Sequence, residues 1–136
     1  MEPEQFTVRG EPVEQATIVR IWEEIKREIA GKYPVGNIKM PNIKAHVLNR
    51  NHFRKVVRKL LWSQHIIDTS EIEWGTKCTK PSAVTFLAEG EWIILKCKGY
   101  GFSLEDDLRH ELLHVWEAKL GLKWGTLTQT ESCRHC

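Results

Sequence analysis

The sequence has no long apolar run and does not begin with basic residues followed by apolar ones. No hydrophobic stretch approaches the roughly 20 residues that a membrane-spanning helix needs. The first residues, Met-Glu-Pro-Glu-Gln, lack the pattern of a secretory signal peptide. These absences predict a cytoplasmic protein whose partners do not include a membrane.

Acidic residues are missing from one long stretch of the chain. None occurs between Glu28 and Asp68, although the net charge of the whole chain is only +2. The basic residues of this interval are Lys32, Lys39, Lys44, Arg50, Arg54, Lys55, Arg58 and Lys59. Such asymmetry permits contact with phosphate groups, so the stretch Lys44–Lys59 is a candidate DNA-binding surface. The alternative interpretation is a solvated helix face.

Cysteine is scarce, and its use does not indicate a disulfide framework. The chain has Cys78, Cys97, Cys133 and Cys136, of which only the last two form a C-x-x-C pair. In a cytoplasmic protein we expect reduced thiols or metal ligands at these positions. A structural zinc site built on all four cysteines is therefore one alternative for this protein.

The 136 residues are expected to form one domain (1–136), with a leader at 1–10 and a tail at 122–136. Apolar periodicity and turn residues predict an α+β fold, in which a small antiparallel sheet packs on an N-terminal helix and a C-terminal helix. One arm of a hairpin is expected to be a sheet edge that binds an extended peptide. The expected elements are helices at 13–29, 51–61 and 104–120, a strand at 43–48, and hairpin arms at 83–88 and 91–97.

The motif His110-Glu111-Leu112-Leu113-His114 lies inside the last of these helices. Histidines four residues apart project from the same helical face, so their imidazoles converge on one cation. Imidazole suits Zn²⁺, and a catalytic zinc takes three protein ligands and one water. Glu111 is placed to receive the proton of that water as it attacks a carbonyl, which predicts a zinc metallopeptidase.

The residues that flank the motif support a helix at this place. Ser103 and Asp106 form a capping pattern at its start, acidic residues fill its first turn, and Gly121 is a stop signal. The positions around the histidines are apolar, as a buried active-site helix requires. The alternative is an amphipathic helix whose histidines are merely partly buried.

The motif, with a hairpin before it and Gly121 after it, resembles the SprT-like zinc metallopeptidases, with minigluzincins as near neighbours. The resemblance implies an α+β zinc peptidase in which His110 and His114 bind zinc and Glu111 is the general base. It also implies that the basic stretch meets DNA, and hence that the substrates include DNA-associated proteins.

The third zinc ligand does not follow from the resemblance. SprT-like proteins usually place a histidine, followed by glycine, ten to twenty residues beyond the motif, and residues 121–126 contain none. We favour His135 in the tail, and the alternatives are Glu131, Glu117 and a tail cysteine. A tail thiolate is also a candidate inhibitor that would bind the zinc in place of water and hold the enzyme latent.

Two further expectations concern the chemistry. A donor for the oxyanion is needed, and Tyr100, His65 and His46 are the candidates. The alternative to an enzyme is a non-catalytic nucleic-acid-binding module whose zinc site is degenerate or structural.

Overall fold

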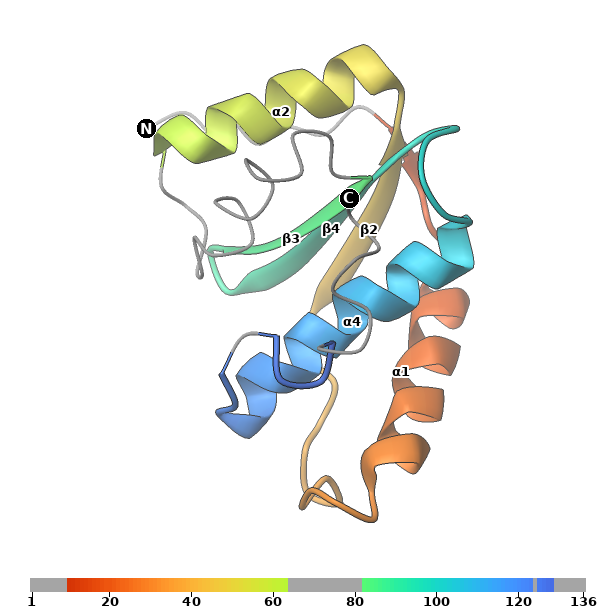
Figure 1. Ribbon diagram of the computed structural model, residues 1–136, viewed down its shortest axis with the longest axis vertical. Helices are drawn as coiled ribbons and strands as arrows, with labels where there is room; N and C mark the ends of the chain where they lie inside the picture. The colour runs from red at the N-terminus through yellow and green to blue at the C-terminus, as the bar shows by residue number, and fades with distance from the viewer. Residues whose placement is uncertain (1–9, 64–81, 124, 129–136) are drawn as a thin grey trace.

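A computed structural model describes residues 10–63, 82–123 and 125–128 of the chain. Their strands form one four-stranded sheet with the order β1-β2-β4-β3. The helices pack on both faces of this sheet (Figure 1). The elements are β1 (Glu11–Pro12), α1 (Gln15–Ile29), β2 (Ile43–Leu48), α2 (Arg50–Ser63), β3 (Ala83–Ala88), β4 (Glu91–Cys97) and α4 (Leu104–Leu120). The α+β class predicted from the sequence is confirmed.

The sheet is mixed, so the prediction of an antiparallel sheet was wrong. The hairpin of β3 and β4 is antiparallel, and β1 pairs antiparallel with β2, but β2 and β4 run parallel. Parallel neighbours need a long crossover connection, and α2 lies in the connection that separates β2 from β4 in the chain. Hydrophobic alternation within each strand reveals which residues share a face, but not which strand lies alongside.

Alternation along the strands gives the sheet two buried faces. Ile43 and Ala45 of β2 and Ile94 of β4 belong to a core that they share with α1 and α4. Leu48 and Leu95 belong to a second core on the opposite face, which α2 covers. Figure 1 shows the same arrangement, with α1 and α4 together on one side of the sheet and α2 on the other.

The α1–α4 pair holds the largest buried side chains of the first core. Trp22 and Trp116 stack with ring centroids 4.1 Å apart, and both are fully buried. At the surface Arg20 pairs with Glu105 at 2.9 Å, and this hydrogen bond holds the pKa of Glu105 below its ordinary value. Arg109, next to His110, pairs with Glu28. These contacts fix the rotation of α4 about its axis.

Helix α4 begins and ends where the sequence predicts. The Ser103 hydroxyl accepts the backbone N–H of Asp106 at 3.1 Å, which caps the first turn. Gly121 ends the helix with φ +72°, a left-handed conformation that glycine adopts without the steric cost of a side chain. The motif therefore lies in the middle of a helix whose two ends are held by local signals.

The helices in the described part of the chain lack the combination of length and apolar composition that crossing a membrane requires.

Candidate metal centre on helix α4

Helix α4 carries a polar stripe along one side. Each member lies three or four residues from another member, which is the spacing of side chains on a single helical face. Each of them is at most 3% exposed, although all five are ionisable. The members are Asp107, His110, Glu111, His114 and Glu117. Buried ionisable groups are costly unless they are paired or hold a metal, so this stripe is the strongest candidate for a functional site.

The two motif histidines lie close enough to share one ion. Their ring centroids are 5.0 Å apart and their planes are nearly perpendicular, at 87°. Nitrogens bound to a tetrahedral zinc at about 2.0–2.1 Å would place two imidazole centroids roughly 5 Å apart. The spacing of His110 and His114 therefore fits Zn²⁺.

The second histidine is held by a carboxylate. Nδ1 of His114 lies 2.9 Å from Oε1 of Glu117. Metal-binding histidines commonly use one ring nitrogen for such a carboxylate contact and the other for the metal. This contact leaves Nε2 of His114 as the nitrogen for a metal.

The carboxylate oxygens of Glu117 already accept hydrogen bonds, which does not suit a metal ligand. Besides His114, its carboxylate oxygens accept the backbone N–H groups of Gly125, Leu127 and Thr128, at 3.0, 2.6 and 3.2 Å. These donors come from the turn that follows α4. The geometry therefore favours an orienting role for Glu117 over the ligand role that we considered from the sequence.

The motif glutamate contacts the hairpin. Glu111 is fully buried, and the hydroxyl of Thr85 on β3 donates a hydrogen bond to its Oε1. Thr85 is opposite Ile94 in the strand register, so it lies on the face of the sheet that α4 covers. Sequence reasoning missed Thr85, although the alternation of the hairpin arms already placed it on one face with Ala83 and Leu87.

A buried ion pair fixes the start of the stripe. Nζ of Lys96 lies 2.9 Å from Oδ2 of Asp107, and both side chains are almost completely buried. The Ser82 hydroxyl donates to the same Oδ2 at 3.0 Å, and Lys96 donates to the carbonyl of Tyr100 at 2.6 Å. Asp107 lies one turn before His110 and Glu111. This pair therefore sets the position of the motif relative to β4.

Most candidates for a third metal ligand lie outside the described residues. Among residues 10–63, 82–123 and 125–128, no group of three or more His, Cys, Asp or Glu side chains is placed to hold a metal. The candidates His135, Glu131, Cys133 and Cys136 fall outside these ranges. The prediction of His135 thus stays a prediction.

Of the four cysteines, only Cys97 is described. It belongs to the core on the α2 face of the sheet, away from α4. Burial raises the pKa of its thiol, which disfavours the thiolate that binds zinc. Cys78, Cys133 and Cys136 lie outside the described residues.

Two of the three oxyanion candidates lie on the wrong face of the sheet. His46 is opposite Leu95 in the strand register, and Tyr100 packs against the core beneath α2. Both side chains are therefore separated from Glu111 by the sheet. Burial and the nearby Lys44 lower the pKa of His46, which disfavours its charged form. The third candidate, His65, lies outside the described residues.

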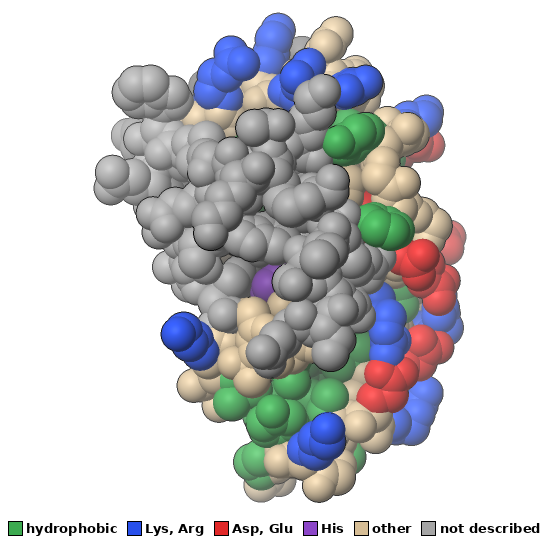
Figure 2. Space-filling model, viewed as in Figure 1, with side chains coloured by type: hydrophobic (Ala, Val, Ile, Leu, Met, Phe, Trp, Pro, Cys, Tyr) green, Lys and Arg blue, Asp and Glu red, His purple; other side chains and the backbone are tan. Residues whose placement is uncertain are grey.

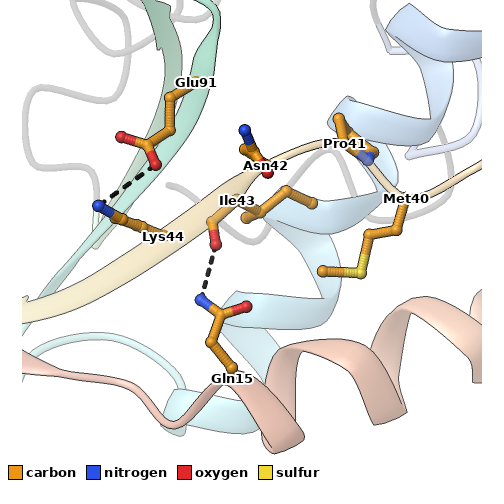
Figure 3. A pocket seen from close by; sticks show the side chains of 7 residues that line it. All are labelled: Gln15, Met40, Pro41, Asn42, Ile43, Lys44 and Glu91. Atoms are coloured by element: carbon orange, nitrogen blue, oxygen red, sulfur yellow. Dashed lines mark hydrogen bonds and ion pairs between the residues drawn. The ribbon is translucent and has the colours of Figure 1, made fainter.

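A surface pocket lies elsewhere, where β2 begins (Figure 3). Its volume is about 340 Å³, and none of the stripe residues lines it. Two contacts join residues that line this pocket. Lys44 pairs with Glu91 at 3.4 Å, and the Gln15 amide donates to the carbonyl of Ile43 at 2.8 Å (Figure 3). The lining residues are Gln15, Met40, Pro41, Asn42, Ile43, Lys44 and Glu91.

No protein family, no curated protein and no solved structure matched this chain.

Proposed function

We propose that this protein is a zinc-dependent metallopeptidase that cleaves peptide bonds. The observation that carries the proposal is the placement of His110, Glu111 and His114. They share one buried helical face, the two imidazoles have the spacing that one zinc requires, and a carboxylate orients His114. The resemblance to SprT-like peptidases and the cytoplasmic location remain predictions from the sequence.

Each residue has a distinct role in this proposal. His110 and His114 hold Zn²⁺, and we expect His135 to be the third ligand. When bound, Zn²⁺ polarises the substrate carbonyl and lowers the pKa of a water towards roughly 7. Glu111 accepts the proton of the attacking water and passes it to the leaving amine. Thr85 holds Glu111 in place for both transfers.

The edge of the sheet supports an extended peptide as the substrate. Within the described sheet, β3 is an edge strand. Cys97 donates its N–H to the carbonyl of Ser82 at 2.8 Å, so alternate residues of β3 pair with β4. The backbone groups of Ala83, Thr85 and Leu87 then point away from β4, where a peptide would add as a further strand. Thr85 sits at the centre of this edge and contacts Glu111 with its side chain.

Zinc content and proteolysis test this proposal together. Wild-type protein prepared without chelators should hold about one zinc per chain and hydrolyse casein. His110→Ala and His114→Ala should each weaken zinc binding by more than about 100-fold, because each removes a ligand. His52→Ala on α2 is the matched control and should bind zinc as wild type does. Wild-type protein that binds no zinc, or equal binding by all four proteins, would contradict the proposal.

The tail hypothesis belongs to the same proposal. If residues 131–136 hold the enzyme latent, their removal raises casein hydrolysis. If they supply the third ligand, their removal lowers zinc affinity instead. These residues lie outside the described part of the chain.

A second candidate function rests on the exposed face of α2. This helix carries no acidic residue, and its exposed basic side chains gather along the top of the molecule (Figure 2). The exposed basic residues are Arg50, Arg54, Lys55, Arg58 and Lys59. A nucleic-acid-binding module would use this face on the phosphate backbone of DNA. The face lies on the side of the sheet opposite α4, so both activities are compatible in one protein.

Charge reversal tests the nucleic-acid surface. Arg54→Glu/Lys55→Glu/Arg58→Glu should reduce binding to duplex DNA at least about tenfold and flatten its salt dependence, because each lost phosphate contact lowers the salt slope by about one. The control, Lys32→Glu/Lys39→Glu/Lys123→Glu, has the same net charge and should bind normally. Equal losses in the two variants would show that only net charge matters, and the surface assignment would be rejected.

A further inference from the structure

The carboxylate of Glu117 accepts several hydrogen bonds on the polar stripe. It is fully buried, and four nitrogens lie within hydrogen-bonding distance of its two oxygens. Three of them are backbone amides of the turn 125–128, which only donate. The fourth is Nδ1 of His114, a ring nitrogen that donates or accepts according to its tautomer.

The Glu117 oxygen that contacts both Gly125 and His114 determines the tautomer of His114. Oε1 of Glu117 receives the N–H of Gly125 at 3.0 Å and lies 2.9 Å from Nδ1 of His114. Both oxygens of Glu117 accept backbone N–H groups of the turn, so the carboxylate faces His114 as an acceptor and His114 carries its proton on Nδ1. Nε2 then holds the lone pair that a metal needs.

We propose that Glu117 is a positioning residue, which holds His114 in the Nδ1–H tautomer and links this histidine to the turn 125–128. This inference rests on the proposed function, since it assigns a purpose to the tautomer. The conformation of the turn suits its contact with Glu117, because Gly125 adopts φ +96°, a backbone conformation that residues with a side chain rarely adopt. A movement of the turn 125–128 would therefore move the Glu117 carboxylate and, with it, the ring of His114.

Glutamine at position 117 cannot reproduce these contacts. If its oxygen faces His114 and Gly125, its NH₂ group faces the N–H donors of Leu127 and Thr128. If it is turned round, its NH₂ group faces the N–H of Gly125, and His114 must move its proton to Nε2 in order to accept. Both orientations oppose donor to donor, and the second also blocks the metal-binding nitrogen.

The first readout is the tautomer of His114 in the metal-free, full-length chain. Two-bond ¹H–¹⁵N correlation spectra at pH about 8, where ordinary imidazoles are neutral, distinguish Nδ1–H from Nε2–H. His114→Gln identifies the signals of His114 among those of the six histidines. We expect Nδ1–H in wild type, and a loss of this preference in Glu117→Gln. An Nε2–H tautomer in wild type would overturn the inference.

The second readout is zinc affinity, measured by competition with a chelator. Glu117→Gln should lose about 10- to 100-fold, the range found when groups that orient metal ligands are changed. Asp106→Asn removes an exposed carboxylate from the same helix and should bind as wild type does. Glu117→Gln with wild-type affinity and a wild-type His114 tautomer would overturn the inference but leave the zinc proposal intact. If wild type binds no zinc, the proposed function fails, and the tautomer alone decides whether Glu117 positions His114.

Discussion

Glu111→Gln should abolish peptide hydrolysis and leave zinc binding unchanged. Glutamine preserves the shape of the side chain, and its carbonyl still accepts the hydrogen bond from Thr85. It cannot accept the proton of the attacking water, and general base catalysis of this kind contributes about 10²- to 10⁴-fold. We therefore expect kcat to fall by at least about 100-fold in a casein or fluorogenic-peptide assay.

The control for this prediction is Glu23→Gln. This substitution makes the same chemical change at an exposed position of α1 and should have wild-type activity. Zinc content measured on the same samples separates a lost base from a lost metal. Normal turnover by Glu111→Gln would reject the mechanism.

Lys96→Met should destabilise the fold by about 3–5 kcal/mol. The substitution removes the cation of a buried ion pair and leaves the carboxylate of Asp107 inside the protein without this charge. It also removes the hydrogen bond to the carbonyl of Tyr100. Urea unfolding followed by circular dichroism measures the free energy of unfolding.

The matching double variant tests whether the cost comes from the stranded charge. Lys96→Met/Asp107→Leu replaces both members of the pair by apolar side chains, and such replacements are often close to neutral. We expect it to recover much of the lost stability, although Ser82 loses its acceptor. A single variant that costs less than about 1 kcal/mol would show that the pair does not hold α4 on the sheet.

Local signals in the sequence predicted the elements around the site. The cap at Ser103, the stop at Gly121 and the hairpin around Glu89–Gly90 are each set by residues that are close in the chain. The alternation of side chains along β4 also predicted which residues share a face, with Ile94 on one face and Leu95 on the other. Such features depend on backbone geometry and capping, and therefore need no knowledge of the tertiary fold.

Contacts between distant residues were not predictable in the same way. Thr85 and Glu111 meet only because β3 lies beneath α4, and Lys96 meets Asp107 because β4 also lies beneath this helix. His46 was wrongly considered as an oxyanion donor, since the sequence does not reveal which face of β2 the helix α4 covers. Glu117 was considered as a ligand because it lies on the same helical face as His114. In the structure, backbone N–H groups of the turn 125–128 donate hydrogen bonds to its oxygens.

We propose above all that His110 and His114 bind one zinc ion next to Glu111. Crystals of the zinc-loaded, full-length protein, measured at the zinc absorption edge, test it most directly. We predict one strong anomalous peak about 2.0–2.1 Å from a ring nitrogen of each histidine, with Nε2 as the ligating nitrogen of His114. An ordered chain with both rings in place and no anomalous peak between them would contradict it.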